Sequence, residues 1–211
     1  DGTYHWLQFS CEDAVCFGSQ YGTVTFDGVS KLSGNFQEII YCQSNSLYQD
    51  SGTFTENYSV TAEGKLFTDN GTNTGFISPD GSLFVLGPVS DVVYYEETGI
   101  VIGVRQANGL TAESIETHYN LVTFGSDHAS EFSSGIGSVI FDGKSDYEAE
   151  LTDVSQSQST GDAFDVGTSS GDYWISRKGE LDLDRMSTGF VSPDASIILW
   201  VPMPGDAPYE E

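Results

Sequence analysis

The sequence has few basic residues: 7 Lys and Arg stand against 32 Asp and Glu among 211 residues, which gives a formal net charge of −25. Proteins that bind nucleic acid or anionic lipid place Lys and Arg against phosphates, and this chain has no basic stripe that could do so. The composition therefore argues against nucleic acid and anionic membrane surfaces as partners.

Long apolar runs are also missing. No stretch of 18 apolar residues occurs, and the first residues lack the charged and then apolar pattern of a secretory leader. The sequence predicts neither a transmembrane helix nor a signal peptide, so an exported protein would be present here in its mature form.

Cysteine is scarce, and its spacing does not match a paired zinc or redox motif. Cys11, Cys16 and Cys42 all lie in the first fifth of the chain. One disulfide and one spare thiol is the simplest interpretation: Cys11 and Cys16 could bracket a stapled loop, or either could pair with Cys42 on a neighbouring strand. Three reduced thiols are the alternative. A disulfide, together with an acidic surface rich in Ser, Thr, Gly and Tyr, is typical of an extracellular or cell-surface protein.

The strongest pattern in the chain is an internal repeat with an offset of 114 or 115 residues. Residues 22–28 (GTVTFDG) match residues 137–143 (GSVIFDG) without a gap. After one deletion, residues 75–82 (GFISPDGS) match residues 189–196 (GFVSPDAS). The chain is therefore interpreted as a tandem duplication, with one unit over residues 1–108 and a second over 109–211.

Each unit has the pattern of a β-meander. Short stretches alternate between apolar and polar residues and are separated by turn residues, of which Asp27-Gly28 fits a two-residue hairpin and residues 78–81 fit a type I turn. In the first unit we expect strands near residues 3–9, 21–26, 32–40, 56–61, 65–68, 74–77, 82–87 and 100–105. The fold class predicted is all-β, with two tandem antiparallel units that are each a small barrel or sandwich of about seven to eight strands, because closure removes exposed edges.

Two segments do not fit this pattern. Residues 110–116 hold the one helical signal and are assigned to the connection between the units. Residues 153–171 are rich in Ser, Gln, Thr, Asp and Gly, and are interpreted as a long surface loop.

The second unit lacks a counterpart of the last strand of the first. Three prolines in residues 202–208 argue against a well-paired strand there. One interpretation is an open or differently closed sheet, or a natural chain longer than the given sequence. The other is that the gap accepts a strand from another molecule by β-augmentation.

Calcium is the only metal that the acidic residues suggest. Oxygen ligands at short spacing occur in two places, at Asp69, Asn70 and Asn73 and at Asp162 and Asp165. Neither segment matches an EF-hand loop, so hairpin turns and solvated faces are the favoured interpretation and calcium binding is the alternative. No other cofactor is expected.

A barrel interior is the remaining place for a ligand. Large rings recur on the expected strands of both units and are the candidate lining, namely Trp6, Phe9, Phe26, Phe76, Phe84, Phe124, Phe141, Phe190 and Trp200. Their recurrence is also what a duplicated, packed core requires.

Four segments of the first unit together resemble the β-meander repeats of secreted bacterial proteins of unknown function. They are the Gly-Thr-Val-Thr-Phe-Asp-Gly pattern, the Tyr-containing strand that ends at Gly64, residues 75–81 and the Gly-Val-Arg strand. In architecture they are similar to lipocalin-like and avidin-like barrels. The resemblance implies a barrel fold and export.

No histidine lies in a metalloprotease or nucleophile-elbow motif, so a non-enzymatic protein is expected. The leading hypothesis is an extracellular structural or interaction protein, a cell-surface or filament subunit that assembles by strand exchange, with itself or another surface protein as partner. The alternatives are a small-ligand-binding barrel and a carbohydrate-active enzyme with two converging carboxylates.

Overall fold

The computed structural model describes residues 1–12, 16–42, 46–68, 73–88, 98–126, 131–157, 161–184 and 187–202. The chain divides into two compact units, Asp1–Gln106 (unit 1) and Ala107–Glu211 (unit 2). Both units are built of antiparallel strands, as the alternation of apolar and polar residues predicts.

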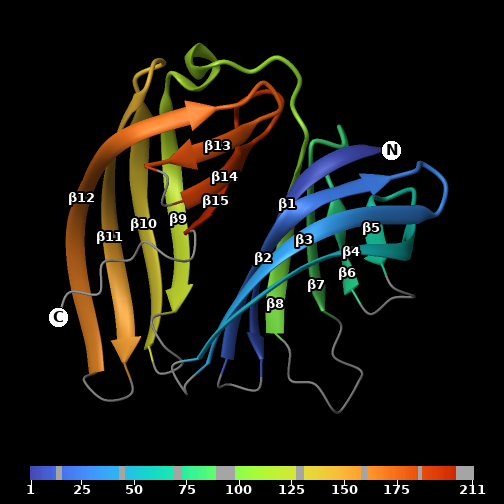
Figure 1. Ribbon diagram of the computed structural model, residues 1–211, viewed down its shortest axis with the longest axis horizontal. Helices are drawn as coiled ribbons and strands as arrows, with labels where there is room; N and C mark the ends of the chain where they lie inside the picture. Colours follow the sequence, from blue (N-terminus) through green and yellow to red (C-terminus); the bar gives the residue numbers. More distant parts are fainter. Residues whose placement is uncertain are drawn as a thin grey trace. The chain divides into compact units, whose positions relative to one another are not determined.

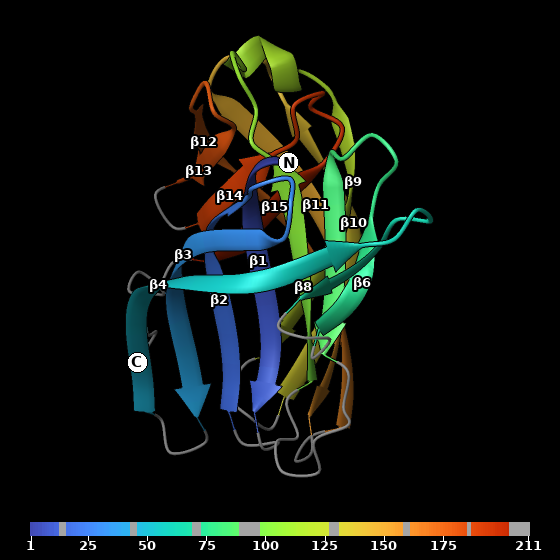
Figure 2. The same cartoon turned by 90° about the vertical axis from the view of Figure 1, so that its right-hand side faces the viewer.

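Unit 1 is a closed barrel in which each strand pairs with its neighbours in sequence, and β8 pairs back onto β1. Figures 1 and 2 show these strands, from blue to green, following one another around the barrel. The strands are β1 (Gly2–Glu12), β2 (Cys16–Phe26), β3 (Lys31–Cys42), β4 (Ser46–Val60), β5 (Lys65–Thr68), β6 (Asn73–Ile77), β7 (Leu83–Pro88) and β8 (Thr98–Arg105).

Unit 2 is a curled sheet of seven strands in the order β15-β14-β13-β12-β11-β10-β9. Its strands are β9 (His118–Ser126), β10 (Glu131–Phe141), β11 (Asp146–Ser157), β12 (Gly161–Ile175), β13 (Glu180–Leu183), β14 (Ser187–Val191) and β15 (Ile198–Pro202). Figure 1 shows that β9–β12 are long ribbons, whereas β13–β15 are short. This is the order of β1–β7 in unit 1.

The two units repeat the same aromatic core. In unit 1, Phe26 packs edge to face on Tyr4 and Tyr58, with ring centroids 5.4 and 4.9 Å apart. In unit 2, Phe141 packs in the same way on Tyr119 and Tyr173, at 5.8 and 4.9 Å. Edge-to-face contacts of this kind add to the hydrophobic stabilisation that the buried rings supply. The duplication seen in the sequence is therefore a duplication of packing.

The Asp-Gly turns are longer than the sequence suggested. The Asp27 carboxylate accepts hydrogen bonds from the backbone N–H groups of Val29, Ser30 and Lys31, at 2.7, 2.9 and 3.0 Å. The turn thus spans several residues after Asp27, and the expectation of a two-residue hairpin was wrong. The carboxylate satisfies donors that a tighter turn would not expose. Asp142 makes the matching three bonds in unit 2.

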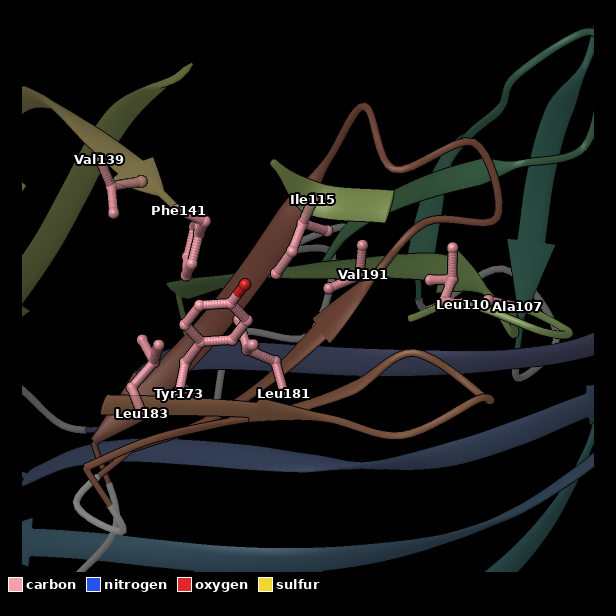
Figure 3. Close-up of a cluster of buried hydrophobic side chains, with 9 residues drawn as sticks. All are labelled: Ala107, Leu110, Ile115, Val139, Phe141, Tyr173, Leu181, Leu183 and Val191. Carbon is pink, nitrogen blue, oxygen red and sulfur yellow. The ribbon is translucent and has the colours of Figure 1, made fainter. Parts of the chain in front are cut away.

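The segment at residues 110–116 belongs to unit 2. It forms a short 3-10 helix, η2 (Ala112–Ile115), and the Ile115 side chain is fully buried in the unit 2 core. Figure 3 shows Ile115 projecting from this helix into the cluster that contains Phe141 and Tyr173. The sequence assigned this segment to the connection between the units, whereas in the structure it supplies core side chains to unit 2.

The expected loop at residues 153–171 is instead a hairpin. Strands β11 and β12 pair antiparallel along this stretch, for example Val154 with Phe164 and Thr152 with Val166. Backbone hydrogen bonds hold this ladder together, and these bonds do not depend on apolar alternation. A composition rich in Ser, Asp and Gly therefore concealed two long strands.

Candidate functional site

A cavity of about 290 Å³ occupies the interior of the unit 1 barrel. It lies against the apolar core cluster, so most of its wall consists of rings and branched aliphatic side chains. The lining residues are Trp6, Gln8, Gln20, Val24, Phe26, Leu32, Phe36, Glu38, Phe54, Glu56, Thr68, Asn73, Phe84, Leu86 and Val101. This volume is at the small end of the range for ligand pockets.

Part of the wall is polar, and its residues follow the strand register. Gln8 on β1 is the cross-strand partner of Gln20 on β2, and Gln20 is the partner of Glu38 on β3. The Gln20 side-chain amide donates a hydrogen bond to the Glu38 carboxylate. These three residues, which we call the polar row, therefore cross three neighbouring strands inside the barrel.

Glycines on the barrel strands let aromatic rings lie flat against the wall. Gly103 on β8 faces Phe84 on β7, and a Cβ atom at Gly103 would overlap the Phe84 ring. Gly34 and Phe54 form a similar pair, in which a Cβ would come within 2.7 Å of the ring. A larger residue at either glycine would push a ring toward the cavity.

Three of the five candidate lining rings of unit 1 line this cavity, namely Trp6, Phe26 and Phe84. Phe76 does not, because its side chain is 60% exposed. Phe9 does not either, because it follows the cavity-lining Gln8 and successive strand residues point to opposite faces. The expectation for Phe9 and Phe76 was wrong because the recurrence of a ring in both units does not show whether its side chain faces the barrel interior or the outside.

The candidate rings of unit 2 have different environments. Phe141 is 1% exposed in the core cluster, and Trp200 packs against that cluster. Phe190 is buried but follows Gly189 and precedes the core residue Val191, so it points to the opposite face of β14. The side chain of Phe124 lies outside the described residues.

Of the calcium candidates, only Asn73 and Asp165 have described side chains, and these two belong to different units. Asp69, Asn70 and the side chain of Asp162 lie outside the described residues, Asn73 lines the barrel cavity, and Asp165 is exposed on β12. Within the described ranges, no group of three or more His, Cys, Asp or Glu residues is placed to hold a metal ion.

Cys16 and Cys42 form a disulfide between β2 and β3. They are cross-strand partners, four residues along each strand from the Gln20 and Glu38 pair. The bond therefore staples the two strands that carry most of the polar row. Of the pairings left open by the sequence, this is the one found; the side chain of Cys11 lies outside the described residues.

Hydrogen bonds also fix the charge of the turn carboxylates. The Ser78 hydroxyl and the backbone and hydroxyl groups of Ser82 donate to Asp80 and lower its pKa to about 2. In the matching turn of unit 2, hydrogen bonds from Ser192 and Ser196 lower the pKa of Asp194. These two carboxylates therefore accept hydrogen bonds that stabilise their own turns.

The sheet of unit 2 has an edge strand on each side, β9 and β15. Among the described residues, β9 pairs with β10 alone and β15 pairs with β14 alone. The counterparts of these strands in unit 1 are β1 and β7, and both of them also pair with β8. The edges of β9 and β15 thus present main-chain N–H and C=O groups with no described strand partner.

An apolar stripe runs across the outward face of β9–β12, away from the core cluster. Cross-strand register aligns Val122 with Ile136 and then, through Thr152, with Val166. Val154 and Phe164 form a neighbouring pair. The exposed fractions are 62% for Val122, 67% for Ile136, 45% for Val154, 70% for Phe164 and 55% for Val166. Clusters of exposed apolar side chains mark interaction surfaces more often than isolated ones do.

The sequence predicted rings and an incomplete repeat, but it missed the polar row and two cavity rings, Phe36 and Phe54. A signal was available, because Gln8 lies two residues after Trp6 and must share its face in a strand.

Comparisons with protein-family models, with curated proteins and with solved structures find no match to this chain. Across the described residues, no helix has the length and apolar character needed to cross a membrane.

Proposed function

We propose that this protein is a non-enzymatic extracellular interaction protein whose second unit accepts a β-strand from another polypeptide. The observation that carries the proposal is the incomplete repeat. Unit 2 reproduces seven strands of unit 1 in the same order, and its edges β9 and β15 are the counterparts of the strands that β8 bridges in unit 1.

The composition of the two edges supports this role. Strands β9 (HYNLVTFGS) and β15 (ILWVP) contain no Asp, Glu, Lys or Arg, although the chain as a whole carries a net charge of −25. Natural edge strands are usually guarded by charged side chains against unwanted pairing. Uncharged edges in so acidic a chain favour pairing with a further strand.

Strand β8 indicates what kind of strand would fit. Its sequence is TGIVIGVR, rich in β-branched residues, with Arg105 as its single charge. Val101 lines the barrel interior and Gly103 makes room for a ring, so small or branched residues face inward. The partner expected is therefore an uncharged or weakly basic strand with this alternation, because a basic strand also complements an acidic chain.

Two further features fit an extracellular interaction protein. The Cys16–Cys42 disulfide is compatible with an oxidising compartment. The apolar stripe on β9–β12 adjoins the β9 edge and offers side-chain contacts to whatever pairs there.

A synthetic peptide with the sequence of β8, Thr98–Arg105, tests the proposal on the full chain. The labelled peptide should bind with a saturable change in fluorescence anisotropy, and the same peptide N-methylated at alternate residues should bind more weakly, because it loses the N–H donors along one of its two edges. Absence of binding by the unmodified peptide would refute strand acceptance.

A matched pair of variants locates the binding. Thr123 shares the inward face of β9 with Tyr119, whereas Asn120 is exposed on the outward face. Thr123→Lys places a charge on the inward face of the β9 edge, where the peptide strand would pair, and should weaken peptide binding about tenfold. Asn120→Lys places the same charge on the outward face and should leave peptide binding unchanged. Equal effects of the two substitutions would contradict binding at this edge.

Light scattering on the protein alone identifies the donor. A monomer that binds the peptide points to a different protein as the natural donor. A particle mass that is a multiple of the chain mass, and that returns to the monomer in Thr123→Lys, makes a second copy the donor. Oligomers that persist in Thr123→Lys would contradict assembly through this edge.

A further inference from the structure

The cavity in unit 1 has an aromatic wall with a defined geometry. Five of its lining residues are aromatic, and Trp6 packs edge to face on Phe54 with ring centroids 6.0 Å apart. Such rings present electron-rich faces, which attract cations and apolar groups alike. The wall can therefore hold the apolar body of a ligand or an ammonium group.

The charged groups of the cavity are all acidic. Among the described residues that line it, Glu38 and Glu56 are present, whereas Lys, Arg and His are not. Glu38 accepts a hydrogen bond from Gln20, but a carboxylate has about four acceptor positions. Glu38 therefore retains acceptor capacity toward a donor inside the cavity.

One buried donor in the wall lacks a partner. The Trp6 side chain is 5% exposed, and its indole N–H has no hydrogen-bond acceptor among the described residues. Burial of an unpaired donor costs free energy, and a ligand that brings an acceptor recovers that cost. The cavity lining thus includes an unpaired donor, the Trp6 N–H, as well as acidic acceptors.

Several residues of this lining are specific to unit 1, whereas the position of Glu38 is acidic in both units, since its counterpart in unit 2 is Asp153. The core rings Tyr4, Phe26 and Tyr58 recur in unit 2 at the same offset, as Tyr119, Phe141 and Tyr173. The cavity residues Trp6, Gln20, Phe36 and Phe54 do not recur, since unit 2 has Leu121, Gly135, Leu151 and Ser169 at those positions. The packing that the two units share, around Phe26 and Phe141, therefore does not account for these four residues.

We propose that the unit 1 barrel binds a small organic cation, an amine with an aromatic or apolar body and a hydrogen-bond acceptor. The body lies among the rings, the ammonium group donates to Glu38, and the acceptor faces the Trp6 N–H. The cavity volume of about 290 Å³ restricts the ligand to a small molecule. The inference concerns unit 1 and does not depend on strand acceptance by unit 2.

Three probes of matched shape test the charge preference by isothermal titration calorimetry on the full chain: phenethylamine, 2-phenylethanol and phenylacetate. The amine should bind about tenfold or more tightly than the alcohol, because a charge-assisted hydrogen bond replaces a neutral one, and the carboxylate should bind weakest. Equal binding of the amine and the alcohol, or binding of none of the probes, would overturn the proposal.

Substitution of Glu38 tests the acidic partner. Glu38→Gln keeps an acceptor for Gln20 but removes the charge, so the preference for the amine over the alcohol should fall to near unity. Glu148→Gln, on the exposed face of β11, is the matched control and should keep the full preference. A preference that survives Glu38→Gln would exclude Glu38 as the partner.

Trp6→Phe tests the indole donor, because it keeps an aromatic ring and removes the N–H. A 4-methoxy group on phenethylamine should raise affinity for the wild type several-fold and give no gain in Trp6→Phe. An equal gain in both proteins would show that the acceptor does not meet Trp6. The unfolding midpoint of each variant is measured in parallel, so that a loss of binding in a folded protein is distinguished from a loss of fold.

Discussion

At the scale of single residues, four aspartates make the turns depend on pH. Hydrogen bonds lower the pKa values of Asp27, Asp80, Asp142 and Asp194 in the folded state, that of Asp80 to about 2 from 3.8. A carboxylate whose pKa is lower in the folded than in the unfolded state stabilises the fold above its unfolded pKa, and this contribution is lost as pH falls. The contribution of Asp80 is thus present above about pH 4, and it is lost as pH falls through about 2.

Asp80→Asn isolates the charge of this turn, since asparagine still accepts hydrogen bonds. The variant should have a lower urea midpoint than the wild type at pH 7, and the difference should shrink steadily as pH falls from about 4 through about 2. Unfolding curves at pH 7, 4 and 2.5 measure it, with Glu148→Gln as the exposed charge control. A difference that is constant with pH would contradict the role given to the Asp80 charge.

The same turn in unit 2 contains a strained residue. Ala195 has a φ of 56°, in the left-handed region, whereas its counterpart Gly81 has a φ of 68°. Only glycine adopts this region without a steric penalty. Ala195→Gly should therefore raise the free energy of unfolding by roughly 0.5 to 1 kcal/mol, and Gly81→Ala should lower it by a similar amount. Denaturant unfolding measures both, and a loss of stability in Ala195→Gly would contradict the strain.

At the scale of elements, the pairing of Gly103 on β8 with Phe84 on β7 controls how closely the barrel wall packs. A methyl group at Gly103 would overlap the Phe84 ring, so Gly103→Ala should lower the free energy of unfolding by about 1 to 3 kcal/mol through overpacking. Gly167→Ala on β12 is the control, because a Cβ there meets nothing within 4 Å. Equal free energies of unfolding for the two variants would show that the Phe84 ring can move away from a Cβ at Gly103 without loss of stability.

The disulfide links two adjacent barrel strands with a sequence separation of 26 residues. A closed loop of this length restricts the unfolded chain, so the double variant Cys16→Ser, Cys42→Ser should lose about 3 kcal/mol of stability. Guanidinium unfolding measures the loss, and Cys11→Ser, which leaves this bond intact, is the reference. A double variant as stable as Cys11→Ser would mean that the bond does not stabilise unit 1.

The positions of the strands could be predicted from the sequence better than their lengths. Each of the eight strands expected in unit 1 is present, but β2 begins at Cys16 rather than near residue 21, and β4 begins at Ser46 rather than near residue 56. The missed ends are rich in Ser, Gln, Asp and Gly, whose alternation is weak, and backbone pairing with a long neighbour extends them. The hairpin of β11 and β12 was missed for the same reason.

The cavity could be predicted only in part. Tandem repetition identified the rings, but which of them face inward depends on the phase of each strand, and this is fixed by closure of the barrel. Trp6 and Phe84 line the same cavity because β8 joins β1 to β7, a pairing between distant parts of the chain. The polar row likewise depends on the register of three strands.

At the scale of the whole molecule, one duplicated meander occurs in a closed form and an open form. Unit 1 is closed by β8 and encloses a lined cavity, whereas unit 2 presents β9 and β15 as uncharged edges. We propose that closure suits the first unit to a small ligand and openness suits the second to a strand. The central claim is the second of these, because it gives the molecule its partner.

The most direct test is hydrogen exchange of the full chain, followed by mass spectrometry, with and without the Thr98–Arg105 peptide. Strand acceptance predicts slower exchange of backbone amides in both β9 and β15 when the peptide is present, because a strand between them pairs with both edges. Exchange in β11, in the interior of the same sheet, should stay the same. Unchanged exchange in β9 and β15 at a saturating peptide concentration would contradict the account.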